Sequence, residues 1–352
     1  MSKEIRNNNQ KINFLDIFYS ILEPLPERSR EIVAKRFGVS EKKPMTLQAI
    51  GNDYTITRER VRQIVQSGLK ASHDKNKKSE IDDVKKTLIN FIDAHHGIVT
   101  EDAIVKEFGQ DHYPIQGAVR YFIEGIKELT YVNPKKYPVV EGVIVHADFD
   151  LNKWHAVHKT AHGTLRKKNY IHTIEQLYTA IQEMHADIDH DILLKFLVVS
   201  REIGRNPFNK WGLVEWDDIS PRGVREKALL IMKEKKQPMH FREIAQAIDE
   251  YGLGKRGRKS HPQTVHNELI RDKNFVLVGR GVYTLHSQNY VGGTVKDVIE
   301  DVLKKSQMPL TSEEVIERVL KMRHVKPSTI KVNLNAIAKK LNKKYTLDSQ
   351  AK

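Results

Sequence analysis

The chain has 352 residues and no cysteine, and its 59 lysines and arginines exceed its 45 aspartates and glutamates, which gives a formal net charge of +14. The lack of cysteine excludes a disulfide-stapled secreted domain, a thiol enzyme and cysteine-ligated zinc or iron–sulfur sites. The length predicts two or more domains. No apolar run approaches the roughly 20 residues that span a bilayer, and Met1–Lys11 is polar rather than a signal sequence, so we expect a cytoplasmic protein.

Five segments repeat one plan, in which an amphipathic helix is followed by a short apolar stretch, a second helix and a third helix. The second helices begin at Thr46, Thr100, Thr173, Phe241 and Thr311. We expect Thr100 and Thr173 to cap their helices, and Thr311 has the capping-box spacing with Glu314. The third helices are expected over residues 58–70, 115–126, 189–203, 262–274 and 327–340. Pro262 and Pro327 suit the first turn of a helix, where a missing N–H costs nothing.

Alternating apolar stretches follow three of the third helices. The clearest runs from Phe275 to Val278, turns at Gly279-Arg280-Gly281 and continues from Val282 to Leu285, which predicts a β-hairpin. Residues 130–132 with 139–145, and residues 211–216, give weaker counterparts. In the fifth segment, Tyr345–Leu347 is the only apolar stretch after the third helix, so we expect the wing of this module to be truncated or missing.

The repeated plan predicts a mainly α protein, a tandem array of helix-turn-helix and winged-helix modules with short β-hairpin wings. The predicted modules span residues 11–76, 80–148, 151–219, 222–286 and 292–348.

The segment from Thr57 to Ile64 carries the most information. Val61, Ile64 and Val65 fall on one helical face. Arg58, Glu59, Arg62 and Gln63 fall on another. A helix over residues 47–53 and a short turn precede this segment, which together predict a helix-turn-helix whose second helix could enter the major groove of DNA. Spacing alone fits an ordinary charged surface helix equally well.

The wording of the N-terminal segment adds a resemblance. Leu25–Gly38, Thr46–Gly51 and Thr57–Ile64 resemble region 4 of the bacterial sigma-70 family, and the resemblance covers residues 11–72. It implies that this segment reads the −35 promoter element and docks on the flap of RNA polymerase. By the same match, Arg58, Glu59, Arg62 and Gln63 would contact bases and backbone, and Thr57 would cap the helix near a phosphate. Arg60 lies in the same motif and joins the candidate DNA-binding residues.

Two features depart from that family. Gln48-Ala49 replaces its acidic pair, and Ser67–Ser72 replaces its basic tail. Only 24 residues precede Leu25, and no aromatic-rich melting helix follows, so we do not expect a domain that opens the −10 element.

Residues 225–285 carry a second resemblance. Pro238–Ile244, Thr264–Leu269 and Gly279–Leu285 resemble the HARE type of winged helix, which occurs in the delta subunit of bacterial RNA polymerase, in restriction and modification proteins and in chromatin-associated proteins. The resemblance implies association with transcription or DNA. From spacing alone, one small core is expected from Leu229, Met232, Ile244, Ile248, Val265, Leu269 and Tyr283.

Positive charge gathers in two places. Lys255, Arg256, Arg258 and Lys259 lie in a glycine-rich loop, and residues 321–352 hold nine basic residues against one acid, Asp348. Clustered cations predict a polyanion partner, although a solvated surface has the same composition. The further candidate DNA-binding residues are therefore Lys255, Arg256, Arg258, Lys259, Arg280, Lys331, Lys339 and Lys340.

Several motifs that suggest other chemistry fail on context. Gly252–Gly257 fits a dinucleotide fingerprint but lacks the preceding strand. His155, His158 and His162 share a helical face without the acidic residue of a metalloprotease motif. Asp187, Asp189 and Asp191 lack the glycine and glutamate that complete a calcium loop. We therefore expect no metal, no cofactor and no enzymatic activity.

The sequence thus predicts a DNA-binding transcription protein of the nucleoid that recognises promoters in the manner of a sigma factor, with double-stranded DNA and bacterial RNA polymerase as partners and no membrane. One alternative is an interaction scaffold that uses the aromatic residues Tyr113, Tyr121, Phe122, Trp154, Trp211 and Trp216, although these residues also suit cores. A remote alternative, a component of a restriction or modification system, rests on the HARE resemblance.

Overall fold

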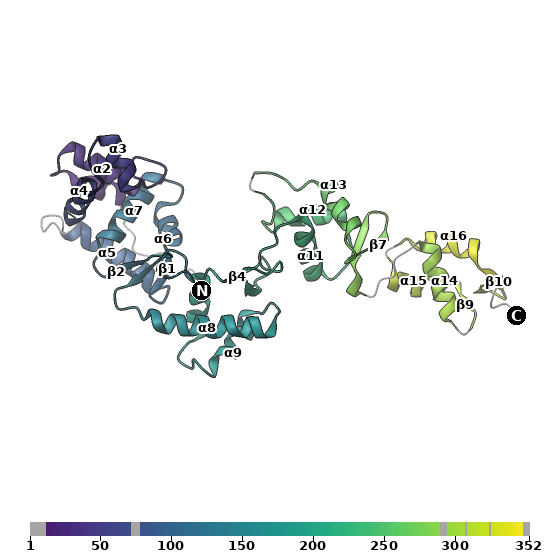
Figure 1. The fold of residues 1–352 in the computed structure, drawn as a ribbon. Helices are drawn as coiled ribbons and strands as arrows, with labels where there is room; N and C mark the ends of the chain where they lie inside the picture. The colour runs from purple at the N-terminus through teal and green to yellow at the C-terminus, as the bar shows by residue number, and fades with distance from the viewer. Residues whose placement is uncertain are drawn as a thin grey trace. The chain divides into compact units, whose positions relative to one another are not determined.

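The structure, a computed structural model, describes residues 12–71, 78–255, 257–288, 294–306, 308–323 and 325–347. It is mainly helical with short antiparallel strands, which confirms the predicted fold class (Figure 1). The chain separates into two compact units, residues 1–204 (unit 1) and residues 205–352 (unit 2). The five narrower module ranges stay predictions.

Unit 1 begins with a helix-turn-helix that is followed by a winged helix. Its elements are α1 (Phe14–Leu22), α2 (Glu27–Phe37), α3 (Leu47–Tyr54), α4 (Arg58–Ala71), α5 (Lys78–Asp93), β1 (Ile98–Thr100), α6 (Glu101–Gly109), α7 (Tyr113–Gly125), β2 (Leu129–Val132) and β3 (Val143–His146). Strand β3 lies between β1 and β2 and is antiparallel to both, with Val145 opposite Ile98 on one side and Thr130 on the other. The weaker predicted wing at residues 130–145 is therefore present.

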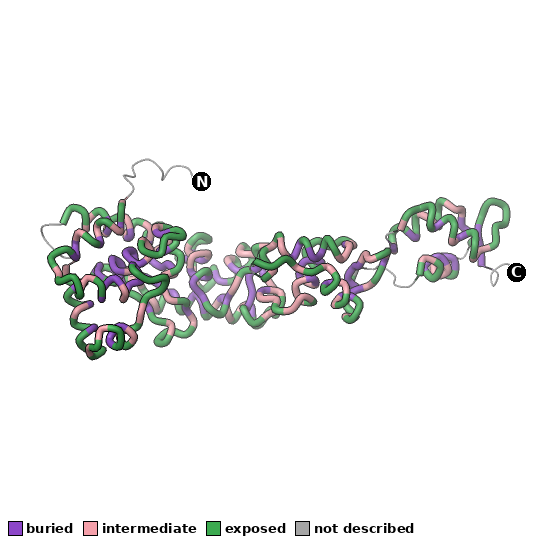
Figure 2. Tube along the Cα trace, turned by 90° about the horizontal axis from the view of Figure 1, so that it is seen from above, coloured by how far each residue is buried: buried purple, intermediate pink, exposed green. Residues whose placement is uncertain are grey.

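One hydrophobic core joins these two modules. The ring of Tyr121 on α7 packs edge-on against Phe18 of α1 and Phe37 of α2, with centroid distances of 5.0 and 5.4 Å. All three rings are buried, and the buried residues of unit 1 lie inside its cluster of helices (Figure 2). The helix-turn-helix is thus held by the winged helix that follows it, because α7 supplies part of its core.

Three helices and a pair of short strands follow, in the part of the chain where the third module was expected. The elements are α8 (Leu151–Lys168), α9 (Ile174–Gln182), α10 (His190–Val198), β4 (Ile203–Arg205) and β5 (Trp211–Leu213). The helix expected to run to Ile203 ends at Val198, and Ile203 starts a strand that pairs with β5. Trp154 of α8 is buried, and its indole N–H donates to the carbonyl of Phe196 on α10 at 3.1 Å.

Unit 2 contains the winged helix expected at residues 222–286. Its elements are α11 (Val224–Lys235), β6 (Met239–His240), α12 (Phe241–Glu250), α13 (Pro262–Arg271), β7 (Phe275–Gly279) and β8 (Val282–Leu285), with β8 between β6 and β7. The hairpin was predicted correctly. Of the expected core, Leu229 is only half-buried, and Ala228 and Ile231 are buried in its place on α11.

The last module of unit 2 corrects one prediction, because its wing is neither truncated nor missing. The elements are α14 (Val295–Lys305), β9 (Leu310–Thr311), α15 (Ser312–Met322), α16 (Pro327–Ile337), β10 (Lys339–Leu341) and β11 (Lys344–Thr346). Asn342 and Lys343 have φ of 48° and 66°, as a two-residue hairpin turn requires, so the chain reverses directly after β10. The helix expected to reach Lys340 ends at Ile337.

The helix starts agree with the predicted caps at Thr100, Thr173 and Thr311, and Thr46 is a further cap. The hydroxyls of Thr46, Thr100, Thr173 and Thr311 each accept a backbone N–H in the first turn of the helix that follows, and Thr173 and Thr311 form capping boxes with Gln176 and Glu314. Within the described ranges, no helix is both long enough and apolar enough to cross a membrane.

Candidate nucleic-acid interface

In the turn between α3 and α4, the backbone of the two helices comes into close contact. A side chain on Gly51 would place its Cβ 2.7 Å from the carbonyl oxygen of Ile56, so only glycine fits there without a shift of backbone. Thr55 ends α3 with φ of 54°. The hydroxyl of Thr57 then accepts the N–H of Arg60 at 3.1 Å and caps α4, as the sequence predicted. The turn therefore fixes where α4 starts and which way its first residues point.

One face of α4 is packed into the unit. Val61, Val65 and Gly68 are buried. At Gly68 the helix meets α2 so closely that an added Cβ would lie 2.7 Å from a methyl of Val33. The phenol of Tyr121 donates to the carbonyl of Gly68 at 2.7 Å, and burial raises the pKa of that phenol. These contacts hold α4 from both modules of the shared core.

The other face of α4 is exposed and polar. It carries all the sequence-predicted residues of this helix, namely Arg58, Glu59, Arg60, Arg62 and Gln63, and Thr57 lies exposed beside them. The structure thus brings these candidates together on one ridge, with their polar groups in solvent. A helix that presents guanidinium and amide groups in this way has the donors that read base edges in the major groove.

Two ties order this ridge before any ligand arrives. The guanidinium of Arg62 donates to both carboxylate oxygens of Glu59, with Nη2–Oε1 at 2.6 Å and Nε–Oε2 at 2.9 Å. This pairing lowers the pKa of the Glu59 carboxyl and raises that of Arg62. Arg60 donates to the amide oxygen of Gln63 at 3.2 Å. Both ties join residues three positions apart on the helix.

Helix α3 is fastened to α2 by polar contacts. Arg28 donates to the carbonyl of Tyr54 at 2.6 Å, and the phenol of Tyr54 donates to Glu31 at 2.9 Å. Lys35 pairs with Asp53 at 3.1 Å. Because α3 supports the start of α4, these contacts help to fix the position of the exposed face of α4 relative to α2.

The candidate DNA-binding residues of the winged helix in unit 2 that contains α11, α12 and α13 lie on its surface. Lys255, Arg258 and Lys259 are exposed in the loop before α13, and Arg280 is exposed in the hairpin turn between β7 and β8. Arg256 lies outside the described residues. The end of the loop is anchored, since the Ser260 hydroxyl donates to Asp249 of α12 at 2.7 Å.

In the last module, acidic and basic residues lie on different elements. Helices α14 and α15 carry acidic residues, whereas α16 and the wing that follows it contain none. Lys331 on α16 and Lys339 and Lys340 on β10 are exposed, and the turn and β11 add Lys343 and Lys344. These last two lysines were not predicted as site residues, because the wing itself was not expected. The module presents a third helix and a hairpin of one sign of charge, which is how a surface that contacts phosphates is composed.

The rejected motifs have structural explanations. His158 is buried and bonds the hydroxyl of Ser200 at 2.8 Å through Nε2, and it stacks on Trp154 at 5.0 Å. Asp187 pairs with Lys153. In the part of the chain that the structure describes, no three histidine or acidic side chains are grouped so that they could hold a metal ion.

The aromatic residues that were considered for a scaffold surface differ in their exposure. Tyr121, Phe122, Trp154 and Trp211 are buried in cores, whereas Tyr113 is 47% exposed. Most of these rings therefore fill cores rather than offer a surface to a partner.

Comparison with known families matches two segments of the chain. Residues 21–71 match the family described as sigma-70, region 4. Residues 223–288 match HARE-HTH, a helix-turn-helix domain whose description includes restriction endonucleases. Both resemblances seen in the sequence are confirmed at the expected positions.

The similarity to one curated relative covers a short segment. The RNA polymerase sigma factor RpoS of Coxiella burnetii is 46% identical to this chain over 55 residues, which are 16% of this chain and 16% of that protein. The chain therefore spans only a small part of the length of that relative.

Proposed function

We propose that this protein is a DNA-binding transcription protein that recognises promoter elements of the −35 type through α4, in association with bacterial RNA polymerase. It acts by binding rather than by catalysis, in the cytoplasm and on the nucleoid, and it does not itself open the −10 element. The observation that carries the proposal is the exposed ridge of Arg58, Glu59, Arg62 and Gln63 on a segment that matches sigma-70 region 4.

The winged helices suit an auxiliary role in the same act. The candidate basic residues of unit 2 lie on a loop, a third helix and two hairpins. Phosphate contacts from such surfaces add affinity without sequence information. Linking two modest binders in one chain raises the effective concentration of each at the duplex.

Arg62→Ala tests base recognition. The substitution removes a guanidinium that Glu59 holds in a fixed position, and we expect it to weaken binding by about 1–3 kcal/mol to a duplex that the protein itself selects from a random library. Competition binding against a scrambled duplex measures the loss of preference. Lys106→Ala, on α6 of the same unit, removes one positive charge outside the ridge and serves as the control. An equal loss on selected and scrambled duplexes would contradict base readout by Arg62.

Substituting Lys339 and Lys340 together by alanine tests the C-terminal wing. If each lysine contacts a phosphate, affinity for all sequences falls, and the slope of log K against log salt becomes shallower by about 0.9 for each lost contact. The matched control replaces Lys304 and Lys305 on α14, which pair with Glu300 and Asp301. A salt slope that stays the same in the wing variant would remove the wing from the DNA interface.

A further inference from the structure

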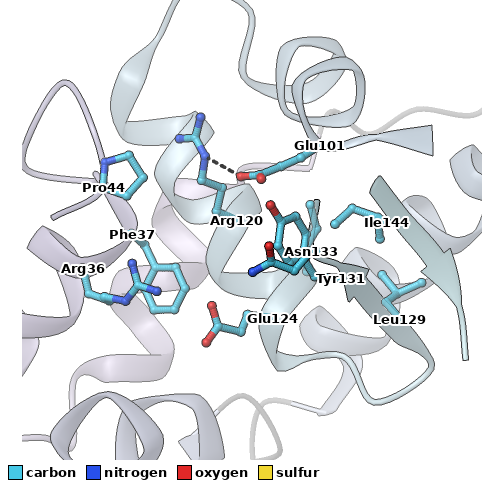
Figure 3. A pocket seen from close by; sticks show the side chains of 11 residues that line it. Arg36, Phe37, Pro44, Glu101, Arg120, Glu124, Leu129, Tyr131, Asn133 and Ile144 are labelled. Carbon is cyan, nitrogen blue, oxygen red and sulfur yellow. Dashed lines mark hydrogen bonds and ion pairs between the residues drawn. The ribbon is translucent and has the colours of Figure 1, made fainter. Parts of the chain in front are cut away.

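A cavity of about 520 Å³ lies in unit 1 where the helix-turn-helix meets the first winged helix (Figure 3). Its walls come from the end of α2, the loop that leads to α3, helix α7 and strands β2 and β3. The cavity is within the size range of small-ligand sites. Neither of the two family resemblances assigns it a role, because it is formed between the two modules.

The walls suit an aliphatic chain. Phe37 and Pro44 line the side of the helix-turn-helix, and Ile123, Leu129 and Ile144 line the side of the winged helix. The exposed ring of Tyr131 stands at the junction with an adjoining pocket and covers Gly142, where an added Cβ would meet its hydroxyl at 2.7 Å. Apolar walls with an aromatic ring can hold methylene groups and can also stabilise a cation.

The arginines of the cavity are already engaged. Arg120 pairs with Glu101, with Nε and Oε1 3.2 Å apart. Arg36 donates to the carbonyl of Met45 at 3.3 Å and lies 5.9 Å from the ring centre of Phe37. Neither arginine forms a hydrogen-bonded ion pair with Glu124.

Glu124 is the carboxylate that remains. It projects from α7 between the two modules, and among the described residues it has neither a hydrogen bond nor an ion pair. Glu124 is exposed at the mouth of the cavity, yet desolvation by the protein atoms around its carboxyl raises the pKa of that group, and the nearby Arg36 offsets only part of that shift. A cation placed beside this group would stabilise its charged form.

The adjoining pocket strengthens the negative character of the site. It shares Glu101, Arg120 and Tyr131 with the cavity and adds Asp102 and Glu141. Together the two hollows hold four carboxylates and two guanidinium groups, and one of the carboxylates, Asp102, also pairs with Lys106 at 2.7 Å. A nucleic acid would be repelled here, whereas a positively charged ligand would be attracted.

We propose that this cavity binds an organic cation, a primary ammonium or guanidinium group on an aliphatic chain, with Glu124 as its counterion and the apolar walls around the chain. The cation can come from a free diamine or from a lysine or arginine side chain of another protein. Because both modules supply walls, an occupant would contact the helix-turn-helix and the winged helix at once.

The test is a titration of the full chain with small cations and a neutral analogue. The NMR signals of the methyl groups of Ile123, Leu129 and Ile144 report binding. The probes are putrescine, N-acetyl-lysine methylamide and N-acetyl-norleucine methylamide, which keeps the aliphatic chain but lacks the ammonium. We expect saturable shifts with an ammonium probe and none with the norleucine compound. Glu124→Gln should weaken the binding at least about tenfold, which corresponds to the loss of one favourable charge contact. Glu107→Gln, an exposed change on α6 outside the walls, should leave it unchanged.

The comparison of probes separates the two sources. Tighter binding of putrescine indicates a free diamine, and tighter binding of the lysine derivative indicates a side chain, so either result supports the cation site. The proposal is overturned if neither ammonium compound gives saturable shifts up to about 20 mM, because one site with a millimolar or lower Kd saturates below that concentration. It is also overturned if the norleucine compound binds equally well, or if Glu124→Gln binds as the unchanged chain does. The glutamine is nearly the same size as the glutamate and breaks no bond, so the spectrum without ligand should show a folded protein.

Discussion

Gly117→Ala should lower the free energy of unfolding of unit 1 by about 3 kcal/mol, although alanine is the better helix former. Gly117 lies within α7, where the helix crosses the end of α2. An added Cβ would lie 2.5 Å from the backbone nitrogen of Val39 and 2.6 Å from the carbonyl carbon of Gly38. Backbone cannot rotate away as a side chain can, and Gly38 is itself held at φ of 78°. The two modules must therefore separate to admit the methyl group.

The measurement is thermal unfolding of the full chain with probes in unit 1, where a loss of this size lowers Tm by roughly 6–12 °C. Gly163→Ala is the matched control, because Gly163 is exposed within α8 and an added Cβ there meets nothing within 4 Å. That change should raise stability by about 0.5–1 kcal/mol through helix propensity. Equal effects of the two substitutions would show that α7 does not press against α2 as described.

The junction at Gly117 also illustrates what the sequence could not predict. The helix starts were readable because threonine caps act locally, within three residues of the chain. The face of α4 was readable because Val61 and Val65 repeat at helical spacing. Contact between α7 and α2 depends on residues almost eighty positions apart, and a glycine inside a helix carries no local sign of the backbone that it faces. The shared core was therefore missed.

The wing of the last module was missed for a different reason. Hairpin turns are usually recognised by glycine, and the turn here is Asn342-Lys343. Asparagine tolerates positive φ, but a lysine at the second position gives no such signal. The apolar pattern was also weak, since all three residues of β10 are exposed. The two lysines that join the candidate interface, Lys343 and Lys344, became visible only with the strand pairing.

The polar ridge of α4 was the easiest part of the candidate site to predict and its internal ties the hardest. Four side chains at helical spacing defined the face, whereas the pairing of Arg62 with Glu59 rather than with another neighbour depends on rotamers. Those ties matter for function because an ordered guanidinium loses less conformational entropy on binding. The same reasoning makes Glu59 a positioning group for Arg62, in addition to any contact of its own.

Unit 1 should lose stability as pH falls from about 6.5 to 4, and His158 should account for about 3 kcal/mol of the loss. Burial lowers the pKa of His158 to about 4, and the neighbouring His155 and His162 add to the shift. An unfolded histidine titrates near 6.5. Between these values the unfolded chain binds a proton that the folded chain refuses, so the stabilisation is complete above pH 6.5 and disappears as pH falls. Glu202, 3.9 Å away and partly exposed, opposes the shift only weakly.

His158→Gln isolates this contribution, because carboxylates elsewhere in the chain also titrate as the pH approaches 4. Glutamine can still bond Ser200 but takes up no proton, so its unfolding free energy should fall less steeply with pH than that of the unchanged chain. The difference between the two curves should grow by about 1.4 kcal/mol for each pH unit below 6.5 and level off near pH 4. Urea unfolding at pH 7, 6, 5 and 4 measures it. Parallel curves would mean that His158 accepts its proton in the folded state, which its burial against Trp154 would then not explain.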